Sequence, residues 1–149
     1  MDHIVYLDAG SGEIENLLHG KKSMIIRGSH GRRMPHGNVN PGDNLYFIDN
    51  VCDGEIRAKG TVSSVFCSEM LTVEESFKII IRNQDKLQLP DNQFDKIAGK
   101  RFLVLIGLEN MIRIDPFRFN NLRSLITDDW LPVGCIEEFI SSGQGIISA

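Results

Sequence analysis

Short stretches that alternate between apolar and polar residues, or that are apolar throughout, recur in the first half of the chain. Such stretches are typical of strands with one or both faces on a core. The pattern predicts strands over residues 3–7, 23–27, 45–48 and 56–63. Val65 continues the apolar positions of the last strand out of phase, so we expect a β-bulge at Ser63 and Ser64.

Apolar residues at helical spacing predict three helices. Residues 13–19 carry three of them on one face, and Gly20 follows where a left-handed residue commonly ends a helix. Thr72 and Glu75 fit a capping box that begins a second helix. The apolar stripe of that helix consists of Val73, Phe77, Ile80 and Ile81. A short third helix is predicted over residues 90–97.

The longest strand pattern covers residues 101–114, and Asp115 and Pro116 are expected to end it. The rest of the chain, residues 117–149, has weaker periodicity and is expected to be irregular or to form short helices. The run of strands from residue 23 to residue 66 lacks the strand–helix alternation of a doubly wound parallel sheet. We therefore predict one α+β domain over residues 1–149, a small curved sheet or β-barrel with helices packed at its ends.

The composition is that of an ordinary globular domain, with 42% hydrophobic and 24% charged residues. The longest apolar run, residues 102–108, is much shorter than the roughly 18 residues that a membrane span needs. The N-terminus lacks the basic and apolar regions of a signal peptide. Three cysteines, Cys52, Cys67 and Cys135, show no CxxC spacing, which suits reduced thiols. We expect a cytoplasmic protein with no membrane partner.

The positive charge is gathered in one stretch, residues 16–36. Five basic residues and no acidic residue lie in this stretch, so it carries +5 within a chain of net charge −4, and the rest carries −9. These basic residues are Lys21, Lys22, Arg27, Arg32 and Arg33. A local positive field in an acidic protein favours a confined anion site over a long polyanion track. The alternative is a solvated loop that happens to be basic.

Several common site motifs are absent. Gly10 and Gly12 follow a strand, but Glu15 stands where a dinucleotide fingerprint has its third glycine. His30 and His36 lie on a glycine-rich loop without the helical context of a zinc site. We therefore predict neither a metal nor a cofactor.

Five residues in the first half of the chain recur in an order that characterises a known family. A glycine and a lysine end a helix, an arginine ends the next strand, and a Gly-Asp pair precedes a hydrophobic strand. These residues are Gly20, Lys22, Arg27, Gly42 and Asp43. Over about its first 70 residues the chain thus resembles the ASCH family of the PUA-like superfamily. The resemblance implies a PUA-like β-barrel, a cleft beside the first helix, and RNA, nucleotides or modified nucleosides as ligands.

Some members of that family resemble amidohydrolases that act on acetylated cytidine with a lysine, a threonine and a glutamate. The lysine position is Lys22, but the threonine position is Ile25, which has no hydroxyl. The glutamate could be Glu69, Glu74 or Glu75, of which Glu75 is already used by the capping box, and Glu69 is our candidate. The loss of a hydroxyl that positions or activates a nucleophile typically costs orders of magnitude in rate. The sequence therefore favours binding over hydrolysis.

Our leading prediction is a module that binds RNA or a nucleotide through a basic cleft. Its candidate binding residues are Lys22, Arg27, Arg32, Arg33 and Trp130. Trp130 is flanked by acidic residues and a proline, so we expect it on a surface turn, where it is available for base stacking. Asp43 is expected to bind the backbone amides of its own turn. The alternatives are a hydrolase of acylated or modified nucleosides and a non-catalytic domain whose basic loop meets an acidic protein.

Overall fold

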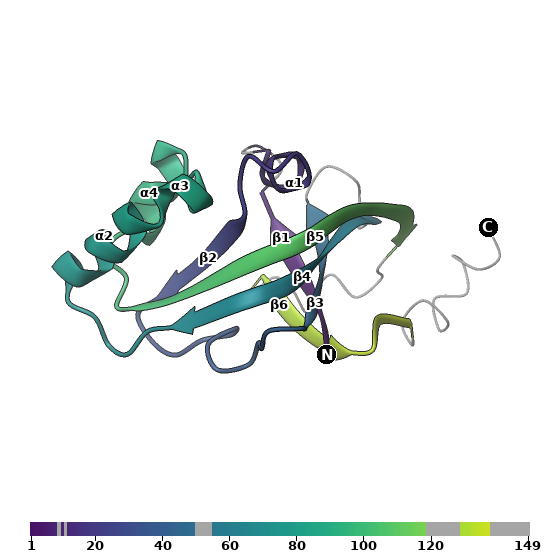
Figure 1. Ribbon diagram of the computed structural model, residues 1–149. Coiled ribbons are helices and arrows are strands. Elements are labelled where there is room, and N and C mark those ends of the chain that lie inside the picture. The colour runs from purple at the N-terminus through teal and green to yellow at the C-terminus, as the bar shows by residue number, and fades with distance from the viewer. Residues whose placement is uncertain (9, 11, 50–54, 119–128, 138–149) are drawn as a thin grey trace.

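The computed structural model describes residues 1–8, 10, 12–49, 55–118 and 129–137 (Figure 1). The strands are β1 (Asp2–Leu7), β2 (Met24–Ser29), β3 (Asn44–Asp49), β4 (Glu55–Cys67), β5 (Phe102–Arg118) and β6 (Trp130–Gly134). The helices are α1 (Glu13–Leu18), α2 (Val73–Arg82), α3 (Gln84–Leu87) and α4 (Asp91–Ile97). In this part of the chain, no helix is long and apolar enough to cross a bilayer.

The strands form one curled sheet in the order β2-β5-β4-β3-β1-β6. β1 and β3 run parallel, and the other neighbours run antiparallel. The register between β4 and β5 shifts at three places, and such irregularities bend and twist a strand. One shift lies between Val62 and Ser64, so the predicted bulge is confirmed. The result is a half-barrel in which β2 and β6 are the two edge strands.

Three apolar clusters hold the sheet and the helices together. The interior of the half-barrel is filled from alternate strand positions, such as Val5 and Phe47, and by Leu17 of α1. A second cluster lies on the opposite face of β1 and β3. A third packs β2 against α2 and α3 through residues such as Ile26 and Ile80. Figure 1 shows α2, α3 and α4 together at one end of the molecule. The predicted α+β fold, a small curved sheet with helices at its ends, is confirmed.

Both predicted helix boundary signals are confirmed. The Thr72 hydroxyl accepts from the Glu75 amide at 3.1 Å, and the Glu75 carboxylate accepts from the Thr72 amide at 2.8 Å. At the end of α1, Gly20 has φ 76°. The Lys21 amide then donates to the Asn16 carbonyl at 2.9 Å, which closes a Schellman motif and sends the chain sharply into β2.

Three local predictions were wrong. β5 does not end at Asp115 and Pro116 but continues to Arg118. β2 pairs only with residues 102–107 of β5, so one edge of the rest of β5 has no partner strand. A proline, which has no amide hydrogen to donate, is tolerated at such an edge. In the described part of the predicted irregular tail, residues 130–134 form β6, which pairs with β1 although its local pattern is weak. Residues 119–128 and 138–149 of that prediction lie outside the described residues. Of the predicted α2 stripe only Ile80 is buried, whereas Val73, Phe77 and Ile81 are exposed.

A buried chain of hydrogen bonds joins β6 and β1 to the turn that precedes β3. The Trp130 indole N–H donates to His3 Nδ1 at 3.1 Å, and His3 Nε2 lies 2.9 Å from Asp43 Oδ2. Since Nδ1 accepts the indole proton, the His3 proton lies on Nε2 and is donated to the carboxylate. Asp43 also accepts from the Asn40 amide at 3.0 Å, which confirms its predicted role in its own turn. The prediction that Trp130 lies on a surface turn is wrong, since it is only 2% exposed.

We expect Asp43 to make the protein less stable in acid. Burial raises the pKa of this carboxyl, but the hydrogen bonds from His3 and Asn40 outweigh that effect and hold the pKa below its usual value. The ionised carboxylate therefore adds stability above the pKa of an unfolded aspartate, about 4, and that stability is lost as the pH falls through the lower folded pKa. Urea unfolding from pH 6 down to pH 2.5 measures this dependence.

Asp43→Asn should remove this part of the pH dependence while keeping an acceptor for His3. Asp95→Asn, at an exposed position on α4, controls for the loss of one negative charge. If Asp43→Asn and wild type lose stability in parallel below pH 4, Asp43 does not contribute in this way.

Candidate functional site

Two adjoining hollows lie along the free edge of β2. The first has a volume of about 170 Å³ and the second of about 390 Å³. Arg27, Gly28 and Asp129 line both hollows, so together they form one groove. The groove exists because β2 pairs with β5 on one side only, while the loop after β2 and helix α4 rise on either face of its open edge.

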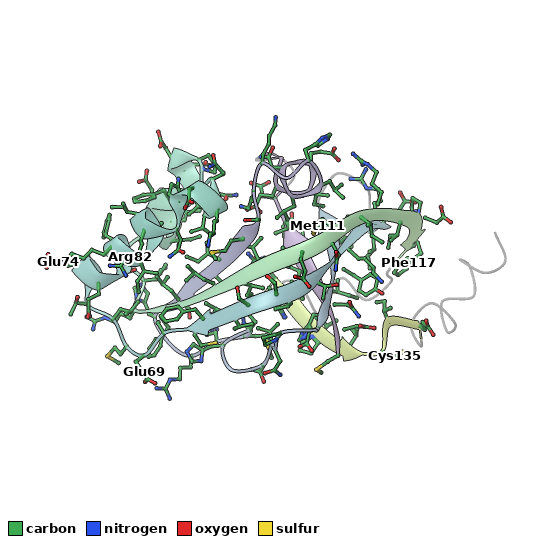
Figure 2. All side chains as sticks on the ribbon, viewed as in Figure 1. Glu69, Glu74, Arg82, Met111, Phe117 and Cys135 are labelled. Carbon is green, nitrogen blue, oxygen red and sulfur yellow. The ribbon has the colours of Figure 1, made fainter. Side chains whose placement is uncertain are left out.

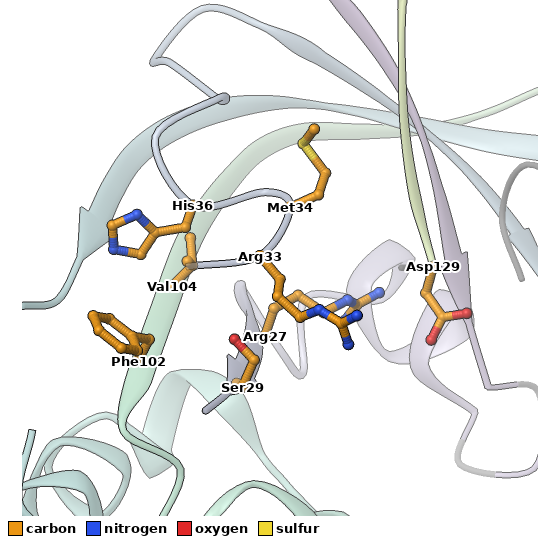
Figure 3. Close-up of a pocket in the computed structure, with 9 residues that line it drawn as sticks. Arg27, Ser29, Arg33, Met34, His36, Phe102, Val104 and Asp129 are labelled. Carbon is orange, nitrogen blue, oxygen red and sulfur yellow. The ribbon is translucent and has the colours of Figure 1, made fainter. Parts of the chain in front are cut away.

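The first hollow opens at the mouth of the half-barrel. Arg27 and Ser29 reach it from β2, because alternate residues of that strand face the barrel interior. Phe102 reaches it from β5, and Arg33 and His36 reach it from the loop that follows β2. Figure 3 shows the two arginine side chains in the middle of this hollow, with Asp129 on one side and Phe102 and His36 on the other. The hollow thus combines two guanidinium groups with an aromatic side chain.

Arg27 stands where the two hollows meet and bridges the open side of the half-barrel. Its Nη2 donates to the Tyr6 carbonyl on β1 at 2.7 Å, and its Nη1 donates to the Ile26 carbonyl at 3.1 Å. Nε is buried and has no partner among the described residues. Burial lowers the pKa of the guanidinium, while the negative charges of Glu13 and Asp129 raise it. An arginine stays protonated in such surroundings, so Arg27 places a fixed positive charge here.

The loop after β2 carries two further arginines with different contacts. Arg33 is exposed and makes no side-chain hydrogen bond or ion pair within the described part of the chain. The Arg32 guanidinium lies over the Phe102 ring at 5.6 Å and pairs with Glu69 at 3.0 Å. His36 fastens the loop, because its Nε2 donates to the Ser68 carbonyl at 2.8 Å. Arg33 is therefore the cation best placed to meet a ligand.

The second hollow has an acidic wall and an apolar wall. Asp8, Glu13 and Asp129 line the first, whereas Ile26 and Ile97 line the second. Lys96 of α4 and Gln93 also border the hollow. Gly28 lets α4 approach β2 closely, since a Cβ there would lie 3.1 Å from Ile97 and 3.2 Å from Leu103. The hollow is thus shaped by the packing of α4 on the edge strand.

Lys22 does not reach the groove as the sequence suggested. It is only 3% exposed, and its ammonium donates to Glu13 Oε1 at 2.8 Å. Lys22 therefore stands behind Glu13, and it is Glu13 that lines the second hollow. Ile25, at the threonine position of the family's hydrolases, is 1% exposed and packs in the barrel core.

The remaining candidates are divided between the groove and its surroundings. Trp130 lies 5.8 Å from the Arg27 guanidinium but is buried, so its ring supports Arg27 and is not open to a base. Glu69 contacts Arg32 rather than Lys22. Sequence reasoning missed Glu13, Phe102 and Asp129 as groove residues. Only the strand pattern around Phe102 offered a signal, because the other two come together through tertiary packing.

The structure is thus a curled six-stranded half-barrel with a groove beside its first helix. Comparison with solved structures makes the class more specific. The crystal structure of ASCH from Zymomonas mobilis superposes with a TM-score of 0.65 over 99% of this chain and 94% of that chain, at 14% sequence identity. A serine-to-alanine variant of the same protein gives a TM-score of 0.66 at 14% identity, with the same coverage of both chains.

A protein from Pseudomonas syringae gives a TM-score of 0.50 at 11% identity, over 98% of this chain and 99% of that chain. No protein-family model matches the sequence, and no curated protein matches it significantly. The chain therefore has the ASCH fold. The predicted resemblance is confirmed at the level of the fold, and it extends over the whole chain rather than the first half alone.

Proposed function

We propose that the protein binds RNA or a nucleotide, including modified nucleosides, in the groove along the free edge of β2. The observation that carries this proposal is the meeting of Arg27 and Arg33 in one hollow beside Phe102, in a protein whose net charge is −4. Guanidinium groups bind phosphate oxygens in a bidentate geometry, and an aromatic ring offers a surface for a base. The ASCH fold of the chain supports the same class of ligand.

The ligand we propose is a single nucleotide or a short single-stranded segment. Residues 16–36 hold five basic residues and no acidic one and carry +5, whereas the remainder of the chain carries −9. A long polyanion would meet repulsion outside the groove, whereas a short ligand stays within the positive field. The cytoplasmic location predicted from the cysteine pattern is part of the same proposal.

Binding has more support than hydrolysis. A lysine that acts on a substrate must reach it, but the Lys22 ammonium is held by Glu13 behind the groove wall. The position of the hydroxyl is taken by Ile25, whose side chain faces the core. Incubation of the protein with a panel of modified nucleosides, followed by chromatography, tests the alternative. Turnover above that of a Lys22→Ala variant would favour the enzyme instead.

We expect Arg32→Ala/Arg33→Ala to weaken RNA binding about tenfold or more at 50 mM salt. The double variant removes Arg33, which lines the first hollow, and its neighbour Arg32, which lies over the Phe102 ring and pairs with Glu69. Each lost phosphate contact also reduces the slope of log affinity against log salt by roughly one. Fluorescence anisotropy with a labelled single-stranded octamer and a labelled hairpin, at salt concentrations from 50 to 200 mM, measures both quantities.

The matched control is Lys78→Ala/Arg82→Ala, which removes the same charge from exposed positions on α2. Figure 2 shows Arg82 on the helices, away from the end of β5 where Phe117 lies. The control should bind like wild type. Equal losses in the two double variants would mean that general charge, not the groove, attracts RNA. No binding by wild type at 50 mM salt would remove the proposal.

A further inference from the structure

The two hollows of the groove differ in size and in chemistry. The second, at about 390 Å³, has the volume of a small-molecule pocket, whereas the first, at about 170 Å³, has room for a smaller group. Arginines characterise the first hollow, and carboxylates characterise one wall of the second. A ligand that spans both must therefore carry an anionic group at one end and hydrogen-bond donors at the other.

Glu13 is the carboxylate whose orientation is fixed most firmly. Its Oε1 accepts from the buried Lys22 ammonium at 2.8 Å. Its Oε2 makes no hydrogen bond to another described residue. This atom is not fully buried, because among the described residues Arg27 Nε is the only buried side-chain nitrogen or oxygen without a hydrogen-bond partner. Because Glu13 lines the second hollow, Oε2 is placed to accept a hydrogen bond from a ligand there.

We infer that the second hollow holds the base of a bound nucleotide and that Glu13, oriented by Lys22, selects bases with an exocyclic amino group. The phosphate lies between Arg27 and Arg33 in the first hollow. An ionised carboxylate only accepts hydrogen bonds, so an amino group satisfies it, whereas an oxo group would place two acceptors against each other. Ile26 and Ile97 offer the apolar wall against which the face of the base packs. This inference rests on the proposed function.

Asp129 is a second acceptor for the same amino group or its neighbours on the base. It lies at the junction of the two hollows, and Figure 3 shows it to one side of the two arginine side chains. Its backbone carbonyl accepts from the Tyr6 amide at 3.0 Å, which ties its position to β1. Unlike Glu13 it is exposed, so a substitution there tests the preference with little risk to folding.

Two pairs of nucleotides test the inference by isothermal titration calorimetry. AMP and IMP carry the same phosphate and sugar but an amino and an oxo group at one ring position, and CMP and UMP differ likewise. We expect AMP to bind about tenfold or more tightly than IMP, and CMP than UMP, the factor that one charge-assisted hydrogen bond gives.

Glu13→Gln should bring each pair to within about twofold, because an amide presents both a donor and an acceptor. Asp129→Asn should reduce the preference in part, and Asp95→Asn, at an exposed position outside the groove lining, should leave it unchanged. Thermal unfolding confirms that each variant is folded.

Equal affinities within both pairs for wild type, or an undiminished preference in folded Glu13→Gln and in Asp129→Asn, would overturn the inference while leaving the proposed function standing. Binding of RNA without binding of any of the four nucleotides would do the same. If neither RNA nor any nucleotide binds, the proposed function itself fails.

Discussion

Replacing Lys22 by methionine is expected to lower the free energy of unfolding by about 3 kcal/mol, because it leaves a largely buried carboxylate without its counter-ion. Lys22 is 3% exposed and donates to Glu13 at 2.8 Å. The Lys22 amide donates to the Asn16 carbonyl at 3.2 Å, which holds this residue beside α1. Methionine is unbranched and keeps most of the length of the lysine side chain, so the loss comes mainly from the charge.

The matched control is Glu13→Leu/Lys22→Met, which removes both charges. Replacing a buried ion pair by apolar residues is often neutral or stabilising, so most of the lost stability should return. Urea unfolding followed by circular dichroism gives both values. If the free energy of unfolding of Lys22→Met lies within about 1 kcal/mol of that of wild type, the ion pair is well solvated and the expected cost of breaking a buried pair does not apply.

Replacing Trp130 by alanine is expected to cost about 4 kcal/mol of unfolding free energy, in the range found when large aromatic residues in a core are truncated. The ring fills the barrel interior beside Val5 and Phe47 and stands 5.8 Å from the Arg27 guanidinium. Its loss also removes the donor to His3 Nδ1. The edge strand β6 should then detach from β1 more readily.

Trp130→Phe separates the two effects. Phenylalanine keeps an aromatic ring but has no N–H, so the cost should fall to about 1–3 kcal/mol for the unpaired acceptor and the reduced volume. Thermal and urea unfolding of the two variants measure the difference. If alanine and phenylalanine cost the same, packing of the ring does not contribute, and the account of Trp130 as a core residue would be contradicted.

The parts of the fold that could be predicted from sequence are those with strong local signals. The helix end at Gly20, the capping box at Thr72 and the bulge near Ser64 each depend on residues within a few positions of one another. β6 and the end of β5 could not be predicted, because both depend on which strands lie beside them. A proline normally ends a central strand, yet Pro116 is accommodated at an edge that only the sheet order reveals.

The site was predicted in part for the same reason. The charge pattern identified Arg27 and Arg33, which do share a hollow. It also suggested Lys22 as a ligand contact, and the residues that flank Trp130 suggested an exposed ring for base stacking, although both side chains are buried. The distribution of charge along a sequence does not show which cation is neutralised by an acidic residue that lies close in space. The partner of Lys22 is Glu13, which lies on helix α1. Glu13 and Asp129 are acidic residues outside the basic stretch, so no local signal connected them with it.

The contacts of the basic residues within residues 16–36 differ from one residue to the next. Of these residues, Lys22 is used to orient a carboxylate and Arg32 to pair with Glu69, whereas Arg27 and Arg33 face the first hollow. The positive field is therefore concentrated at one end of the groove, and the acidic wall lies at the other. This separation favours a ligand whose own charge and hydrogen-bond donors are equally separated, as they are in a nucleotide.

A two-dimensional NMR titration of the isotopically labelled protein with a single-stranded RNA octamer tests the central claim most directly. Saturable shifts are predicted for the amides of Gly28 and Ser29 on β2 and of Arg33 and His36 on the loop, because these residues line the first hollow. The amides of α2 should stay in place. Shifts concentrated on α2, or no saturable shift along β2 and its loop, would contradict the assignment of the groove as the ligand site.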